Sequence, residues 1–405
     1  MATLIYANAN SLFDYSNGAA RSLRLLLEAM ASSGIRVFAI TSCVSDSQEG
    51  CRYSQSVWSE QHQRTPGKHP LIQRFIQSGV HHTLIFSKDH RRQQLTSQAQ
   101  ELIYREAELI LSSCSQTPDP CGFLSWGNLL LEEALYQRAR GLGISTFFYL
   151  ANPSYRGKPS APLRLADLIF TDSKATQRFY QGHTESPIQV LPKIIAPPSS
   201  TISADKRWAK KTVSLINPCL KKGLKQFIAL AHDCQQSGDP FHFLLIDAAG
   251  KLDRDLHKLQ LTREQLPANI QIRPGTPDTD LLLADSSILM LLSIWHESGS
   301  RLIHEAHQRS IPVLAFATGG TPERMQHTPA DLFPAPDNNS QWDHSALTKR
   351  LRELLGDRSL YGHHAKQLQH HTHQLEAANR AGAIDALQQA LQLPKTRRSQ
   401  LSRQT

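Results

Sequence analysis

The stretch Ile288-Leu-Met-Leu-Leu-Ser-Ile-Trp-His-Glu297-Ser-Gly-Ser-Arg-Leu-Ile-His-Glu305 decides the fold of this chain. It opens with an apolar run, Ile288 to Leu292, which is typical of a strand buried on both faces. A short polar loop containing Glu297 follows, and the pattern after Ser300 predicts a helix that carries Glu305 in its early turns. Such a strand–loop–helix unit is the building block of a parallel α/β sheet.

We expect the start of that helix to bind an anion. Ser300 is a good N-cap residue, and Gly299 lets the backbone approach a ligand closely. The free N–H groups of the first turn and the helix dipole favour a group such as a diphosphate, and Arg301 adds a charged donor at the same end. The carboxylates of Glu297 and Glu305 suit sugar and ribose hydroxyls instead, because a carboxylate can accept two hydrogen bonds at once.

The residues after Glu305 favour a ligand site over an ordinary helix face. The simplest alternative is a first Glu that only favours the helix dipole and a second Glu on a solvated face. Here, however, Ile311-Pro-Val313 predicts another buried strand, and Gly319-Gly-Thr-Pro-Glu323 predicts a turn directly after it. This context makes a binding role for the two glutamates the better hypothesis.

The rest of the chain repeats the alternation of strands and helices in two halves. A strand at 4–7, a helix with the apolar stripe Leu23, Leu26, Leu27 and Met30, and a strand at 36–40 predict a βαβ unit and a parallel sheet. We expect Gly34 to end that helix and the polar region 46–70 to be a mobile insertion. Further strands are predicted at 83–86, 109–112, 144–149 and 168–171, and then at 213–216, 241–246, 270–272, 288–292 and 312–316.

With 405 residues, the chain suits two domains of ordinary size. The best linker is the segment 196–211, which holds two prolines, small polar residues and a basic run. We predict an α/β fold with an N-terminal Rossmann-like domain over 1–196 and a C-terminal domain over 197–374. A helix over 375–393 is expected to pack back on the first domain, and the basic tail 394–405 is expected to be disordered.

Composition restricts the partners and the compartment. The net charge of +9 can attract phosphorylated small molecules or an anionic membrane face, and no nucleic-acid module accompanies it. Six scattered cysteines without a CxxC pair favour reduced thiols. The sequence shows neither a signal peptide nor an apolar run long enough to span a bilayer. These features predict a cytoplasmic protein, with peripheral docking at the inner membrane face left open and nucleic acid set aside.

Several motifs together resemble a known family, the retaining GT-B glycosyltransferases of family 4, also described as glycosyl transferases group 1. The strongest part of the resemblance is Glu297, Glu305-Ala306, the Ile311-Pro-Val313 strand and the Gly319–Glu323 turn. Weaker similarities cover most of the chain and lie at Ser16-Asn-Gly-Ala-Ala-Arg21, Leu168–Thr176 and Val213–Gly223. The resemblance implies a GT-B fold, in which two Rossmann-like domains face each other across a cleft.

It also implies that a sugar passes from a nucleotide-diphosphate donor to a glycan, lipid or small-molecule acceptor, as in a hexosyltransferase, without a cofactor or a required metal. By position, Glu297 would lie against the transferred sugar and Glu305 would hold the ribose hydroxyls. Lys222 would contact the diphosphate and act with Glu297 in catalysis, aided by the N–H groups of 299–301. The remaining candidate substrate-binding residues are Gly18, Asn217, Thr318, Gly319 and Gly320, in addition to Gly299, Ser300 and Arg301.

One departure from the family pattern keeps other functions open. Asn217 stands where the family commonly has an Arg five residues before the Lys, and the missing charge would have to come from Lys221 or Arg301. A catalytically silent module that binds a nucleotide sugar or a partner is therefore the main alternative, and an epimerase acting on a nucleotide sugar is a third. The D-x-D pairs at 253–255 and 278–280 are better explained as helix-start and turn carboxylates than as metal ligands.

Overall fold

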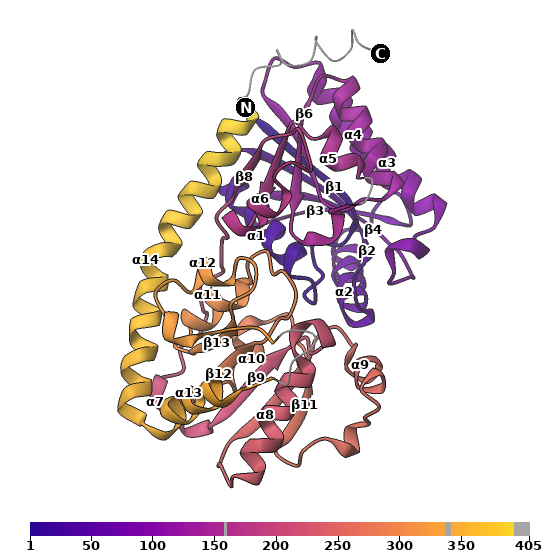
Figure 1. Cartoon of the computed structure of the whole chain (residues 1–405). Coiled ribbons are helices and arrows are strands. Elements are labelled where there is room, and N and C mark those ends of the chain that lie inside the picture. The colour runs from indigo at the N-terminus through magenta and orange to yellow at the C-terminus, as the bar shows by residue number, and fades with distance from the viewer. Residues whose placement is uncertain (158–159, 337–341, 393–405) are drawn as a thin grey trace. The chain divides into compact units, whose positions relative to one another are not determined.

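The computed structural model describes residues 1–157, 160–336 and 342–392, and the chain divides into two compact units (Figure 1). Among the described residues, unit 1 comprises those from Met1 to Ile194 together with those from Asn379 onward, and unit 2 comprises those from Ile195 to Ala378. This division falls close to positions 196 and 374, where the sequence places the domain boundaries. The tail 394–405, expected to be disordered, lies outside the described residues.

Unit 1 is built on an eight-stranded sheet in the order β3-β4-β2-β1-β5-β6-β7-β8. Its central strand β1 (Thr3–Asn10) is buried along its whole length and pairs in parallel with β2 (Arg36–Val44) and β5 (Cys121–Ser125). The edge strand β3 is antiparallel to β4, and the other pairs are parallel. The remaining strands are β3 (Ile72–Gln77), β4 (Val80–Ile85), β6 (Ser145–Leu150), β7 (Leu168–Thr171) and β8 (Ile188–Val190).

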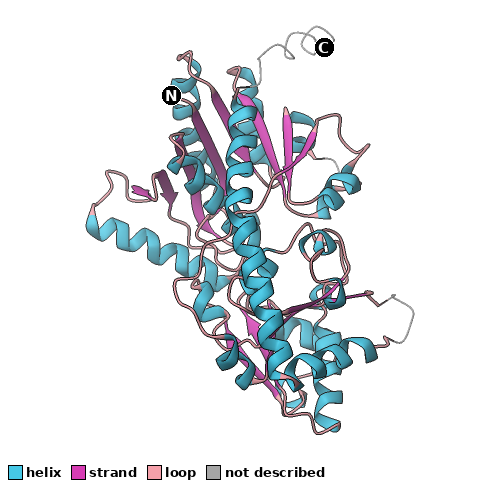
Figure 2. Ribbon diagram, turned by 90° about the vertical axis from the view of Figure 1, so that its left-hand side faces the viewer, coloured by secondary structure: helices cyan, strands magenta, loops and turns pink. Residues whose placement is uncertain are grey.

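The predicted first βαβ unit is present. Helix α1 (Gly18–Ser32) buries the expected stripe of leucines and Met30 against the sheet. Asn17 caps this helix by accepting the N–H groups of Ala19 and Ala20. Figure 2 shows helices packed against the strands of each unit. The other helices of unit 1 are α2 (Gln48–Arg64), α3 (Ser97–Ser115), α4 (Leu130–Gly141), α5 (Ala161–Leu165) and α6 (Lys174–Tyr180), with 3-10 turns η1 (Arg92–Gln94) and η2 (Pro153–Tyr155).

Two predictions for unit 1 are wrong. The region 46–70 contains the helix α2, which Ser47 caps by accepting the N–H of Gly50. This helix fully buries only Gly50, Cys51 and Ser54, and its hydrophobic residues Val57 and Trp58 are partly buried, so the apolar periodicity of its sequence is weak. The apolar run 109–112 lies inside helix α3 rather than in a strand, with Leu111 buried and Leu109 exposed. Short apolar runs do not distinguish a strand from a helix face.

Unit 2 is a six-stranded parallel sheet in the order β11-β10-β9-β12-β13-β14. Numbered within the unit, this is the doubly wound order 3-2-1-4-5-6, whose direction reverses between β9 and β12. Ligands of such sheets bind outside the carboxyl ends of the strands at this point. The strands are β9 (Thr212–Ile216), β10 (His242–Asp247), β11 (Ile270–Pro274), β12 (Ile288–Leu291), β13 (Val313–Phe316) and β14 (Leu332–Phe333).

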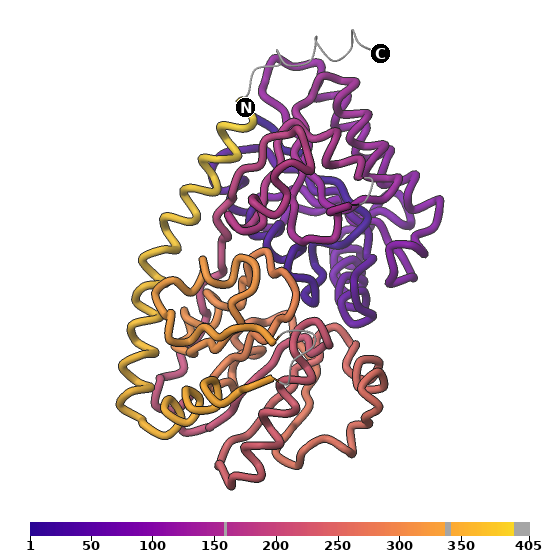
Figure 3. The backbone as a smooth tube through the Cα atoms, in the orientation of Figure 1, coloured from indigo at the N-terminus to yellow at the C-terminus, as the bar shows by residue number. Residues whose placement is uncertain are grey.

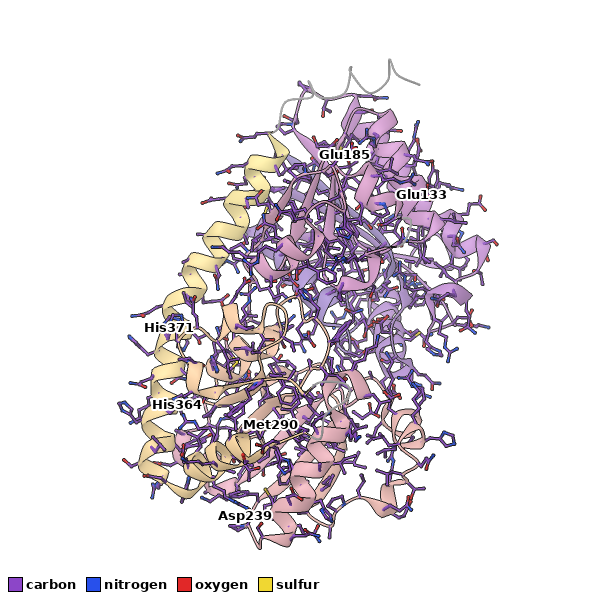
Figure 4. All side chains as sticks on the ribbon, in the orientation of Figure 1. Glu133, Glu185, Asp239, Met290, His364 and His371 are labelled. Carbon is purple, nitrogen blue, oxygen red and sulfur yellow. The ribbon has the colours of Figure 1, made fainter. Side chains whose placement is uncertain are left out.

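The five strands predicted for the second half are all present, within two residues at each end. Their apolar side chains form two clusters on the two faces of the sheet, and Met290, labelled in Figure 4, lies in the interior of unit 2. The expected linker 196–211 includes a short helix, α7 (Ala204–Lys210). The other helices are α8 (Leu224–Gln236), α9 (Leu252–Lys258), α10 (Thr279–Leu282), α11 (Arg301–His307), α12 (Thr321–Arg324) and α13 (Ser345–Gly356), with 3-10 turns η3 (Leu220–Lys222), η4 (Arg263–Gln265) and η5 (Pro329–Asp331).

The last helix, α14 (Arg358–Leu391), belongs to both units and can be followed as the yellow tube in Figure 3. Its first turns place Tyr361 and Ala365 in the core of unit 2, and its last turns place Leu387 and Leu391 in the core of unit 1. No helix in the described parts of the chain is long and apolar enough to cross a membrane.

Candidate functional site

Glu297 lies at the carboxyl end of β12, in the loop that leads to α11. Its Oε1 atom accepts a hydrogen bond of 2.6 Å from the Ser293 hydroxyl and one of 2.9 Å from the indole Nε1 of Trp295. Both donors are neutral and both come from the same loop. They fix the orientation of a half-buried carboxylate without neutralising its charge.

The Gly-Gly turn after β13 packs against the main chain of Glu297. The N–H of Gly320 donates to the Glu297 carbonyl at 2.7 Å, and the Thr318 hydroxyl donates to the Ser293 carbonyl at 3.1 Å. Gly319 has a φ of +53°, and a Cβ atom there would lie 2.1 Å from the Glu297 carbonyl oxygen. The structure therefore brings together Glu297, Thr318, Gly319 and Gly320, and a glycine is needed at 319 for both conformation and space.

Glu305 is paired with Arg301 one turn earlier on α11. The guanidinium donates from Nε at 3.1 Å and from Nη2 at 2.6 Å, both to Oε1 of Glu305. Their side chains are only 6% and 2% exposed, so this is a buried ion pair. Arg301 Nη1 is also buried and has no hydrogen-bond partner among the described residues. The charge that the sequence assigns to a diphosphate is thus largely taken up by Glu305.

Ser300 occupies the position before α11 as expected, but its side chain makes no capping hydrogen bond. The prediction of a side-chain cap is therefore wrong. Gly299 is buried beside Ser298, whose hydroxyl has no partner among the described residues. His304, the residue before Glu305, is buried as well.

The turn that follows β9 carries the lysines of the site. The Ile294 N–H donates to the Lys221 carbonyl at 2.9 Å, which joins this turn to the Glu297 loop. Gly223, at a φ of +80°, is packed so tightly that a Cβ atom there would lie 2.2 Å from the Leu292 carbonyl oxygen. Lys222 is half-buried, and no described residue forms an ion pair with its ammonium group. Lys222 and Glu297 thus lie on adjoining segments at the reversal point between β9 and β12.

Asn217 directly follows β9 and has a left-handed conformation, with a φ of +53°. Its N–H donates to the Ile246 carbonyl at 2.8 Å, so the turn stays attached to β10. Asn adopts this conformation more readily than most side chains do. This gives a structural reason for Asn at the position where the sequence comparison expects a charged residue.

Gly18 is in unit 1, where it is exposed as the first residue of α1. The loop before it is held by Asp14, which accepts the Ser16 N–H at 2.9 Å, the Ser16 hydroxyl at 2.6 Å and the Asp46 N–H at 2.8 Å. Burial, and to a lesser extent the nearby Asp46 carboxylate, raises the pKa of Asp14 to about 6. The loop contains a buried acid that titrates near neutral pH.

Sequence reasoning missed Trp295, which connects Glu297 to the lysine turn through its Nε1 bond and its ring. A tryptophan two residues before a predicted catalytic Glu was the available signal. His296, also next to Glu297, has its pKa lowered by burial, against the opposing effect of Glu297 and Glu323. The neutral imidazole adds no positive charge to the loop near neutral pH.

The described residues contain no group of three or more His, Cys, Asp or Glu arranged to hold a metal. Asp278 caps α10 by accepting the Asp280 and Leu281 N–H groups, and Asp253 and Asp255 lie in the first turn of α9. Both D-x-D pairs therefore lie at helix starts, where the sequence predicts them.

The comparisons with known proteins agree with this geometry. Residues 211–374 match the family model described as Glycosyl transferases group 1, which covers the sheet and loops of the site. Comparison of the sequence with curated proteins gives no match.

Solved structures resemble the chain over nearly its whole length. They include Anabaena Alr3699/HepE in complex with UDP-glucose, with a TM-score of 0.64, 14% identity and coverage of 96% of this chain and 100% of that one. The E. coli structure described as trehalose-6-phosphate bound with UDP-2-fluoro glucose has a TM-score of 0.61 and 9% identity, with coverage of 97% of this chain and 100% of that one. An S. aureus TarM mutant in complex with fondaparinux, alpha-GlcNAc-glycerol and UDP has a TM-score of 0.61 and 9% identity, with coverage of 96% of this chain and 99% of that one. These matches show that the chain has the GT-B fold of two Rossmann-like domains, and residues 211–374 carry the group 1 glycosyltransferase pattern.

Proposed function

We propose that this protein is a retaining glycosyltransferase of family 4, of the hexosyltransferase type, that uses a nucleotide-diphosphate sugar. The observation that carries the proposal is that the loop of Glu297 and the turn of Lys222 adjoin at the reversal point of the unit 2 sheet, where the Ile294 N–H donates to the Lys221 carbonyl. A carboxylate fixed by neutral donors suits a sugar, and an ammonium that pairs with no acidic group among the described residues suits its diphosphate.

In the proposed reaction, the bond between the anomeric carbon of the donor sugar and the diphosphate oxygen breaks, and the diphosphate keeps the electron pair. An acceptor hydroxyl oxygen bonds the same carbon on the same face, and its proton passes to the departing diphosphate. Lys222 and the N–H groups of 299–301 stabilise the negative charge that develops on the leaving group. Glu297 orients the sugar hydroxyls as this bond breaks.

We assign acceptor recognition to unit 1, whose sheet also reverses its order, between β1 and β5. At this edge Asn10 is buried, and neither atom of its amide has a partner among the described residues. Such groups suit the hydroxyls of a glycan, lipid-linked or small-molecule acceptor. We further propose that the enzyme is cytoplasmic, needs no metal or cofactor, and docks peripherally on an anionic inner membrane face through its positive net charge.

A thermal-shift screen against UDP, GDP, ADP, TDP and their sugars tests donor binding. A ligand that binds the folded protein at a hundred times its Kd stabilises it by about 2.7 kcal/mol, which shifts the unfolding temperature measurably. The proposal is wrong if no nucleoside diphosphate or nucleotide sugar stabilises the protein.

Transfer itself is tested with Glu297→Gln, using the donor from that screen. We expect turnover to fall about a hundredfold, because an oriented charge in the site is lost while the shape is kept. Glu185→Gln, at an exposed glutamate of unit 1 labelled in Figure 4, serves as the control and should retain activity. Donor binding without transfer or hydrolysis would favour the silent module, for which Asn217 is the main support. Product formation without an acceptor would favour the epimerase.

A further inference from the structure

The cations of the unit 2 site are not equally available to a ligand. Arg301 donates two hydrogen bonds to Glu305, so this buried pair is close to neutral as a unit. Glu297 has no cationic partner among the described residues, since the two donors that fix it are a hydroxyl and an indole. A diphosphate bound beside Glu297 therefore brings two more negative charges to a site where Arg301 contributes little compensation.

The turn η3 supplies the charge that is left. It contains Lys221 and Lys222 in succession, and no described acidic residue pairs with either ammonium group. The main chain of Lys221 is fixed to the Glu297 loop by the 2.9 Å bond from the Ile294 N–H. Asn217, at the start of the same connection, carries no charge. Helix α11 has only seven residues, so side-chain cations are the larger source of positive charge here.

The side chain of Lys221 is directed towards the Glu297 loop and not along α8. Its Nζ atom lies 5.4 Å from the centroid of the Trp295 ring, within the range of a cation–π contact. The same indole donates its Nε1 hydrogen to Glu297 at 2.9 Å. One aromatic side chain therefore contacts the ammonium on its face and the carboxylate at its edge.

We propose that Lys221, held over the face of Trp295, is a second diphosphate-binding cation of this site and acts beside Lys222. The inference rests on the proposed function and adds to it the residue that replaces the charge absent at Asn217. Lys221 remains exposed, so its ammonium can reach a phosphate oxygen while its stem stays on the indole. The ligand class it selects is a nucleoside diphosphate, in preference to a nucleoside monophosphate.

The test compares Lys221→Met, Lys222→Met and Lys225→Met. Lys225 is an exposed lysine at the start of α8, directly after the turn η3. It is therefore a matched control for the loss of one surface charge. Binding of UDP, GDP and ADP, and of UMP, GMP and AMP, is measured by titration calorimetry at two NaCl concentrations. Unfolding temperatures of the ligand-free variants confirm that each is folded.

For the nucleotide that binds the wild type, we expect Lys221→Met to weaken the diphosphate about tenfold and the monophosphate less than twofold. Lys221→Arg should restore diphosphate binding to within threefold, and Lys225→Met should leave it unchanged. Diphosphate binding by Lys221→Met should also depend less steeply on NaCl, since one exposed charge contact is gone.

The inference is overturned if Lys221→Met binds the diphosphate within twofold of the wild type while Lys222→Met does not. It is also overturned if mono- and diphosphate weaken equally. Either result leaves the proposed function standing, because the wild type still binds a nucleoside diphosphate. A wild type that binds none of the six nucleotides overturns both proposals.

Discussion

The carboxylate of Glu305 and the guanidinium of Arg301 form a buried ion pair on one face of α11, with a shortest distance of 2.6 Å. Removal of one partner leaves an uncompensated charge in the interior, whereas removal of both leaves an apolar contact. This relationship determines how the helix at the centre of the site tolerates substitution.

We expect Arg301→Met alone, or Glu305→Leu alone, to lower the free energy of unfolding of unit 2 by about 3–5 kcal/mol. The double variant should lie within about 1 kcal/mol of the wild type, because an apolar pair of similar volume can replace the ions. Urea unfolding of the four proteins provides the double-mutant cycle. Additive losses in the double variant would show that the two side chains are stabilised independently.

A second prediction concerns the orientation of Glu297. Ser293→Ala and Trp295→Phe each remove one hydrogen bond to its carboxylate, and bonds to charged groups contribute about 1.5–3 kcal/mol. We expect each variant to lose roughly tenfold or more in turnover and to unfold at a temperature lower by several degrees, so that it is still folded in the assay. Ile294→Ala, in the same loop and with a half-exposed side chain, is the control for loop packing. Equal losses in all three variants would point to loop packing instead of carboxylate orientation.

The Gly-Gly turn gives a third prediction. Gly319→Ala places a Cβ atom against the Glu297 main chain and forces an alanine to a φ of +53°. Gly238→Ala imposes a similar φ of +72° with no atom within 4 Å, so it measures the conformational cost alone. We expect Gly238→Ala to lower the free energy of unfolding by about 1–2 kcal/mol and Gly319→Ala to lower it more, as measured by thermal or urea unfolding. Similar losses in the two variants would mean that the turn relaxes away from Glu297.

Much of unit 2 could be predicted from the sequence because its signals are local. Continuous apolar runs mark β9 to β13, and the loop with Glu297 lies between such a run and a helix start. The Arg301–Glu305 spacing was also visible, as residues one helical turn apart. The burial of this pair could not be predicted, because it depends on which residues cover α11 in the folded protein. Trp295 was missed for the same reason, since its contacts with Lys221 and Glu297 come from a folded loop.

The errors in unit 1 have physical causes as well. The predicted strands do not include β5, Cys-Gly-Phe-Leu-Ser, which is only five residues long and contains a glycine, so it carries little strand signal. It is nevertheless a central strand, between β1 and β6, and its residues Phe123 and Leu124 are fully buried. The helix α2 was missed because its apolar signal is weak, although Ser47 caps it and its partly buried Val57 and Trp58 pack against Cys43 and Leu84.

The last prediction concerns the pH dependence of unit 1 through Asp14. Its pKa rises from 3.8 to about 6 on folding, so the folded state binds the proton more tightly than the unfolded state does. The free energy of unfolding therefore falls as pH increases from about 4 to about 6, by about 3 kcal/mol in total. His82, with a pKa lowered to about 3 by burial, acts in the opposite direction, because its stabilisation is lost as pH falls below 6.5. The two are separated by comparison with Asp14→Asn, which keeps His82 and removes the acid. The wild type should lose stability relative to this variant between pH 4.5 and pH 7 in thermal unfolding. A difference that stays constant over that range would show that Asp14 titrates as an ordinary surface carboxyl.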